Sequence, residues 1–255
     1  MKNFSKFFVY FFEIDVIFKK ITLKGFDMIT THSNKLALSK YWNLFNECTD
    51  FSAFQRCLKK IAKECSKNQY LGLEKLCSKQ YDSGRNITLY ENDCFKKSCG
   101  DIFEVFSECL FRYFSTDDIF GCEPNTYKST NDTEDLGCDG NFILSVNGGN
   151  AYVQIKYRNN QTEKPFDLEV FSKLFFDAWK HGFEPENEKH RLIFITNLNA
   201  GERTFIQCAT PIVQNIIKEN FKKLGERIII IGRNEIEEKV NGHLGFWKEF
   251  IQFCK

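Results

Sequence analysis

Residues 137–158 decide the fold, and they read GCDGNFILSVNGGNAYVQIKYR. Two apolar segments flank the triplet Asn147-Gly148-Gly149, which is a turn signal of the kind that joins antiparallel strands. We therefore predict strands over residues 142–146 and 151–158, joined as a β-hairpin.

The second predicted strand carries two polar side chains on one face. Successive side chains of a strand point to opposite faces, so Gln154 and Lys156 point the same way. Asp139 stands just before the first strand. An acid, an amide and an amine at one end of a hairpin are typical of a site that cleaves phosphodiesters.

Length and composition set wide limits. The chain has 255 residues and a formal net charge of +1, which allows one large domain or two small ones. Global charge therefore argues neither for nor against a nucleic-acid partner, and any such contact needs a local basic patch. The 28 phenylalanines supply ample apolar area for a core.

The 11 cysteines leave two interpretations open. Nine of them lie between Cys48 and Cys138, and no spacing gives the paired Cys-x-x-Cys of a zinc ribbon. A secreted disulfide scaffold explains the clustering, and so do reduced cysteines buried on helices. We favour the second interpretation and expect Cys57, Cys65 and Cys109 to be buried thiols.

The same interpretation indicates an intracellular protein, nuclear or cytoplasmic, with secretion still open. The Phe-rich residues 2–20 resemble a signal peptide only weakly, because Glu13 and Asp15 interrupt the apolar run. That run is too short for a membrane span, so no membrane partner is expected.

Hydrophobic periodicity and turn signals predict the order of elements. Helices are expected within residues 35–80, and a helix capped by Asp101 is expected to run to Phe114. After the hairpin we predict a helix over 167–181 with Trp179 among its inward side chains, a strand over 191–197, a helix over 211–224 and a strand over 227–231.

This order, with Asp139 before one strand and Gln154-x-Lys156 on the next, resembles the restriction-endonuclease-like superfamily, whose motif is written PD-(D/E)xK. The nearest subgroup is the Mrr-like type IV enzymes and related helicase-associated nuclease domains, in which the triplet is often Q-x-K. Residues 100–104, GDIFE, match the Gly-x-x-Phe-Glu helix of that subgroup, and Ile195-Thr196-Asn197 matches its Thr-Asn turn. The resemblance covers about residues 98–240.

The resemblance implies an α/β fold with a restriction-endonuclease-like core, in which a mixed central sheet of about four to five strands is flanked by helices. It places a nuclease domain at residues 96–255, after a helical, Cys-rich region of unknown role at residues 1–95.

The implied activity is hydrolysis of DNA by a Mg²⁺- or Mn²⁺-dependent endonuclease, alone or within a restriction or mobile-element system. Asp139 would be the principal metal ligand, Gln154 and Glu104 would add ligands, and Lys156 would orient water or stabilise negative charge. DNA is the implied partner, and a helicase or other motor protein and a homodimer are compatible with it. Phosphate contacts are expected from Arg158, Arg203, Lys222 and Lys223.

The sequence departs from the family pattern at two positions. Cys138 stands where Pro is common, and Gln154 is neutral where most members have an acid. The neutral amide weakens divalent metal binding unless Glu104, or Glu134 with Asp135, compensates.

Other interpretations stay open for each residue. Asp139 followed by Gly could start a turn, Gln154 and Lys156 could belong to a solvated face, and Glu104 could be solvated. The histidines are expected at the surface or at caps, because His32, His181, His190 and His243 show no ligand spacing. For the whole chain, the alternatives are an inactive nuclease-fold module that binds DNA or protein, and a secreted Cys-rich helical protein.

Overall fold

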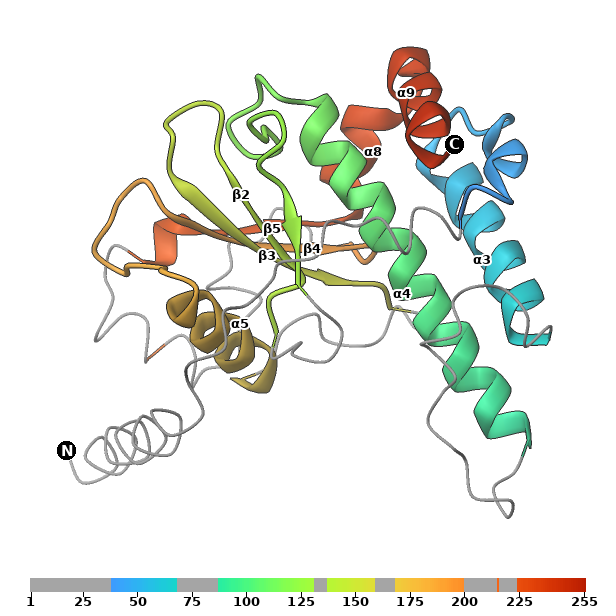
Figure 1. The fold of residues 1–255 in the computed structure, drawn as a ribbon, viewed down its shortest axis with the longest axis horizontal. Helices are drawn as coiled ribbons and strands as arrows, with labels where there is room; N and C mark the ends of the chain where they lie inside the picture. Colours follow the sequence, from blue (N-terminus) through green and yellow to red (C-terminus); the bar gives the residue numbers. More distant parts are fainter. Residues whose placement is uncertain (1–37, 68–86, 131–136, 159–167, 200–214, 216–223) are drawn as a thin grey trace.

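A five-stranded mixed sheet lies at the centre of the protein (Figure 1). The structure is a computed structural model that describes residues 38–67, 87–130, 137–158, 168–199, 215 and 224–255. The strands follow one another across the sheet in chain order, with β1 and β2 antiparallel to their successors and β3, β4 and β5 parallel. Their bounds are β1 Lys128–Ser129, β2 Gly140–Ile143, β3 Asn150–Lys156, β4 Arg191–Thr196 and β5 Ile228–Ile231. The expected mixed α/β class is thus confirmed.

The predicted hairpin forms between β2 and β3, with Gly140 opposite Val153 and Ile143 opposite Asn150. Gly148 has φ +66°, a conformation that favours glycine. The first strand begins and ends earlier than the predicted 142–146, because the turn closes at Leu144. The Leu144 amide donates to the Gly149 carbonyl at 2.7 Å, and the Gly148 amide donates to the Leu144 carbonyl at 2.8 Å.

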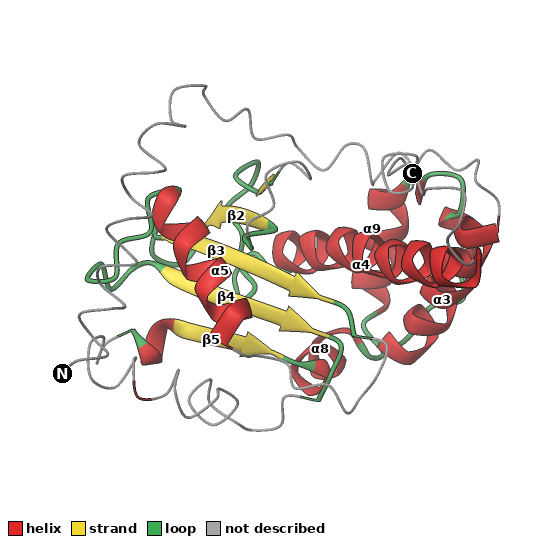
Figure 2. Ribbon diagram, turned by 90° about the horizontal axis from the view of Figure 1, so that it is seen from below, coloured by secondary structure: helices red, strands yellow, loops and turns green. Residues whose placement is uncertain are grey.

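Two helices cover opposite faces of the sheet. Helix α4, Ile87–Tyr113, packs on the face that carries Val153 and Ile155, whereas helix α5, Leu168–Lys180, packs on the face that carries Tyr152. Figure 2 shows α5 lying across the strands. The parallel β3–α5–β4 connection is the crossover unit that needs a helix between its strands.

The remaining elements form a helical layer against α4 (Figure 1). They are η1 Trp42–Phe45, α3 Phe51–Lys67, α8 Arg233–Val240 and α9 Leu244–Cys254, whereas the short η3 Gly225–Arg227 lies at the start of β5. Stacked and edge-on rings join this layer, since Phe54 lies 4.3 Å from Phe106 of α4 and 5.6 Å from Phe250 of α9 by ring centroids.

The hydrophobic core continues across the expected domain boundary near residue 95. That boundary falls inside α4, and the side chains of α3 belong to the same apolar cluster as those of α4, β3 and α9. The described part of residues 1–95 therefore packs as one unit with the sheet. Residues 1–37 and 68–86 lie outside the described residues.

Several local predictions need correction. Asp101 does not cap a helix, because α4 begins at Ile87 and Asp101 is buried within it. Trp179 is 50% exposed rather than inward. At 100° per residue it lies about a quarter turn from the centre of the stripe formed by Phe171, Leu174, Phe175 and Ala178. Helices α8 and α9 were not expected, and the helix predicted over 211–224 lies almost wholly outside the described residues.

No disulfide joins the cysteines whose side chains are described, so each of them is a reduced thiol. Cys109 is buried as predicted. Cys57 is half-buried, and its sulfur lies 3.7 Å from that of Cys48. The side chain of Cys65 is outside the described set. None of the described helices is both long and apolar enough to cross a membrane.

Candidate active site at the start of β2 and the end of β3

Asp139 and Lys156 meet where β2 begins beside the end of β3. The Lys156 Nζ lies 3.8 Å from Asp139 Oδ1. The other oxygen, Oδ2, accepts a hydrogen bond from the Ile155 amide, and the Asp139 amide donates to the Val153 carbonyl at 2.8 Å. The Asp139 side chain is 4% exposed and that of Lys156 is 31% exposed. The carboxylate is thus held by the backbone of β3, while the ammonium group reaches solvent.

Gln154 adds a buried oxygen that no group of the described residues satisfies. The residue is 2% exposed, and its Oε1 has no hydrogen-bond partner. The ladder pairs Gly140 with Val153, and Asp139 bonds to the backbones of Val153 and Ile155, the two neighbours of Gln154. A buried polar atom without a partner costs about 1–3 kcal/mol, and such an atom calls for a water, an ion or a functional role. The burial of Gln154 also rules out the solvated face as its environment.

Glu104 lies on the other side of the sheet from Gln154 and Lys156. It is half-buried on α4, the helix that covers the face of Val153 and Ile155. Gln154 and Lys156 alternate onto the opposite face, which they share with Tyr152. The structure therefore brings Asp139, Lys156 and Gln154 to one corner of the sheet, whereas Glu104 belongs to the helix on the opposite face.

Tyr127 is a buried residue whose hydroxyl interacts electrostatically with carboxylates of α4 and with that of Asp139. Its ring is 3% exposed and stacks on Phe142 at 6.0 Å between centroids. Its hydroxyl packs on Gly140, where an added Cβ would lie 2.6 Å from that oxygen. Burial raises the pKa of this hydroxyl well above its usual value. Three carboxylates raise the pKa further, and they belong to Glu108, Glu104 and Asp139.

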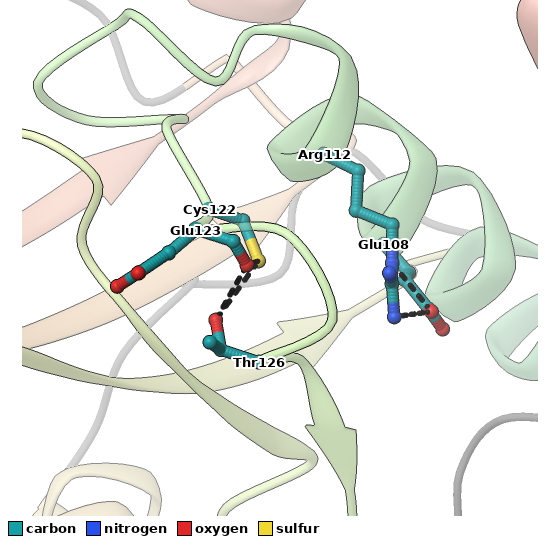
Figure 3. Close-up of polar contacts among 5 residues, drawn as sticks. All are labelled: Glu108, Arg112, Cys122, Glu123 and Thr126. Carbon is teal, nitrogen blue, oxygen red and sulfur yellow. Dashed lines mark hydrogen bonds and ion pairs between the residues drawn. The ribbon is translucent and has the colours of Figure 1, made fainter.

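The turn before Tyr127 and the α4 pair beside it are drawn in Figure 3. The Thr126 hydroxyl donates to the Glu123 carbonyl at 2.7 Å and accepts from the Ile143 amide at 3.1 Å, which ties the turn to β2. Glu108 is 1% exposed, and its Oε1 accepts from Arg112 at 2.8–2.9 Å. Its second oxygen, Oε2, is buried without a hydrogen-bond partner.

The oxygen ligands at the corner fit a divalent cation that keeps much of its water. Among the described residues, no group of three or more His, Cys, Asp and Glu side chains is placed to hold a metal. Mg²⁺ is usually bound through only one or two carboxylates, with several waters retained. Asp139 supplies one carboxylate, and Gln154 supplies the unsatisfied amide oxygen. Glu134 and Asp135 lie outside the described residues.

The Thr-Asn turn after β4 holds the chain that follows Lys156. Asn197 Oδ1 accepts from the Arg158 amide at 2.6 Å, and its Nδ2 donates to the Arg158 carbonyl at 2.8 Å. These two hydrogen bonds extend the contact between the β3 and β4 segments past the end of β3. Of the four residues expected to contact phosphate, Arg158 is half-buried, and Arg203, Lys222 and Lys223 lie outside the described residues.

The histidines serve local structure. His243 Nδ1 accepts from the Phe246 amide at 3.1 Å and caps α9, and His190 Nδ1 accepts from the Glu184 amide at 3.1 Å. His190 is buried, so it is not a surface residue. His181 is partly buried, and its Nε2 lies 3.6 Å from Asp177 Oδ1. His32 lies outside the described residues.

Two residues near the corner were missed in the sequence. Tyr127 gave no signal, because it sits in a polar, turn-rich stretch. Asp177 gave one, because it is a charged residue between Leu174 and Ala178 on the apolar stripe of α5. Its Oδ2 accepts from the Cys138 amide at 3.0 Å, one residue before Asp139.

Comparisons with known proteins add no relative. No protein-family model matches the chain, and no curated protein matches it.

Proposed function

We propose that the protein is a metal-dependent endonuclease that hydrolyses DNA phosphodiester bonds, alone or within a restriction or mobile-element system. The main observation behind this proposal is that Lys156 Nζ lies 3.8 Å from Asp139 Oδ1. At the same corner, the buried Gln154 Oε1 has no hydrogen-bond partner among the described residues. The order of β1, β2, β3, α5 and β4 supports the proposal, because it follows the restriction-endonuclease-like pattern that the sequence resembles.

The residues at the corner have separable roles. The Ile155 amide fixes one oxygen of Asp139, so the carboxylate is oriented before any ligand binds. Asp139 and Gln154 would hold Mg²⁺ or Mn²⁺, with Glu104 as a ligand through water. When bound, the metal supplies Lewis-acid stabilisation of the phosphate and an activated water. Lys156 is exposed enough to reach the phosphate or the attacking water, where its positive charge offsets developing negative charge.

The second candidate function is an inactive nuclease-fold module that binds DNA or protein. One observation favours it. Gln154 is neutral, and the Asp139 carboxylate in contact with Lys156 is already paired with that ammonium group. Such a corner could bind a phosphate through Lys156 without cleaving it.

Asp139→Asn is the experiment that separates these functions. The substitution keeps size and hydrogen-bonding capacity but removes the charge that would hold the metal. Nicking of supercoiled DNA is measured across a Mg²⁺ titration, with Asp118→Asn as the matched control because Asp118 is exposed. Metal assistance is worth several kcal/mol, and about 1.36 kcal/mol is tenfold in rate, so we expect Asp139→Asn to abolish nicking.

Each outcome of that experiment selects a function. Asp118→Asn should cleave like the wild type, and metal-free DNA affinity of Asp139→Asn should stay level or rise, because a negative charge near the phosphate is gone. Equal nicking by Asp139→Asn and wild type would remove the nuclease proposal. DNA binding without nicking by any variant would favour the inactive module.

A further inference from the structure

Asp177 is a buried carboxylate in a helix face that is otherwise apolar. The residue is 1% exposed and lies among the α5 side chains that cover the sheet, next to Ala178 and one turn after Leu174. Burying a charge costs free energy unless hydrogen bonds compensate. A leucine would pack at such a position without that cost, so the carboxylate needs a reason to be there.

The partner of Asp177 is the backbone that leads into Asp139. Asp177 Oδ2 accepts from the Cys138 amide at 3.0 Å, with both residues buried. A hydrogen bond to an ionised acceptor is stronger than one between neutral groups. The other oxygen, Oδ1, lies 3.6 Å from His181 Nε2 one turn later on the same helix.

The same segment touches α5 at a second point. Gly137 has φ +140°, and an added Cβ would lie 2.6 Å from the backbone carbon of Lys173. The chain therefore lies on the helix backbone at Gly137 and is bonded to Asp177 at Cys138. The next residue is Asp139, whose carboxylate meets the Ile155 amide and Lys156.

We propose that Asp177 is a positioning residue that acts through the Cys138 amide to hold the Asp139 carboxylate against β3. Two contacts with α5, one with the Lys173 backbone and one with the Asp177 carboxylate, fix the path of residues 137–138, and this path sets the direction in which the Asp139 side chain leaves the chain. The catalytic consequence rests on the proposed nuclease function, whereas the positional consequence does not.

Asp177→Leu, Asp177→Asn and Phe175→Leu form the test series. Asp177→Leu leaves the Cys138 amide without its acceptor, and Asp177→Asn restores an acceptor oxygen without the charge. Phe175→Leu loosens the packing of the same helix through a side chain whose ring lies 5.9 Å from that of Phe183, and it leaves the Asp177 carboxylate in place. Should Asp177→Leu fail to fold, the smaller Asp177→Ser removes the carboxylate in its place.

The first measurement is the rate of nicking at saturating Mg²⁺, each variant at the same interval below its Tm. A misplacement of about 1 Å can cost about 10²-fold in rate. We expect Asp177→Leu to lose about that much in kcat with little change in KM, Asp177→Asn to recover most of it, and Phe175→Leu to lose little. Equal kcat for Asp177→Leu and Phe175→Leu would overturn the positioning role.

The second measurement needs neither DNA nor metal. Amide hydrogen exchange is followed at Ile155, the donor to Asp139, and at Ile193 in the middle of β4 as reference. Faster exchange at Ile155 but not at Ile193 in Asp177→Leu supports the positioning role, even if the wild type cleaves no DNA and the nuclease proposal falls. Unchanged exchange at Ile155 in a protein that cleaves DNA would overturn the positioning role and leave the nuclease proposal standing.

Discussion

Lys156 Nζ lies 3.8 Å from Asp139 Oδ1, and the two side chains differ greatly in exposure. Asp139 is 4% exposed, so removing its counter-charge leaves a nearly buried carboxylate. A surface ion pair is worth little, but loss of one partner of a buried pair is destabilising. The lysine thus has two separable effects, one on the folded protein and one on any reaction at the corner.

Lys156→Met should lower the Tm without metal and lower it less with Mg²⁺, because a cation at Asp139 replaces the missing positive charge. Nicking should fall steeply, since the substitution also removes the ammonium group that would face the phosphate. Thermal denaturation with and without excess Mg²⁺ measures the first effect. Lys156→Arg is the control that keeps the charge. Identical Tm shifts in Mg²⁺ for wild type and Lys156→Met would contradict a metal site at Asp139.

Gln154→Glu should make the protein less stable without metal and more responsive to Mg²⁺. The added carboxylate is buried where the amide oxygen already has no partner, so its charge is costly until a cation compensates it. Isothermal titration with Mg²⁺ should show tighter binding than in the wild type, with Gln154→Leu as the variant that removes the oxygen. Binding that is no tighter in Gln154→Glu than in Gln154→Leu would place the metal elsewhere.

The hairpin was predictable because its information is local. The period-2 alternation put Gln154 and Lys156 on one face of β3, and the Asn147-Gly148-Gly149 turn set the pairing of the strands. Their closeness to Asp139 follows from that pairing together with the bonds of Asp139 to the backbones of Val153 and Ile155. The two hydrogen bonds between the Asn197 side chain and the Arg158 backbone were not predictable, because they depend on the parallel alignment of β3 and β4.

Other features depend on contacts between distant segments. Asp101 resembled a helix cap, yet α4 continues before it, because propensity alone does not stop a helix whose apolar face is buried by α3. The packing of α3 on α4 likewise joins the region before residue 95 to the sheet. The sequence shows Asp177 as a charged residue on an apolar helix face, but its hydrogen bond from the Cys138 amide can be found only in the structure.

Phe54→Ala should be among the most destabilising single changes in the helical layer. Phe54 is fully buried, and its ring lies between those of Phe45, Phe106 and Phe250. Truncation of a buried Phe costs about 3–5 kcal/mol. Trp179→Ala is the control, because Trp179 is half-exposed and surface changes cost about 0.5 kcal/mol or less. Urea denaturation compares the two, and equal losses would contradict a single core that joins α3, α4 and α9.

Protonation of His190 should lower the free energy of unfolding in mild acid. Burial lowers the pKa of its imidazole below the usual value, and nearby Arg227 lowers it further against the opposing effect of Glu184. The geometry agrees, since Nδ1 accepts a hydrogen bond from the Glu184 amide and cannot do so when protonated. The unfolded chain therefore binds this proton more readily than the folded one. The stabilising contribution is present above the unfolded pKa, about 6.5, and is lost as the pH falls through that value towards the folded pKa.

His190→Asn isolates that contribution, because the Asn side chain offers an acceptor oxygen to the Glu184 amide and does not titrate. Urea denaturation at a series of pH values from about 7.5 to 5.5 brackets the unfolded pKa. The wild type should lose more of its free energy of unfolding over this range than His190→Asn does, while the two profiles run parallel at higher pH. Carboxylates that titrate at the low end act equally in both proteins, so the difference between the profiles reports His190 alone. A difference that stays constant across the whole range would show that His190 does not couple protonation to folding.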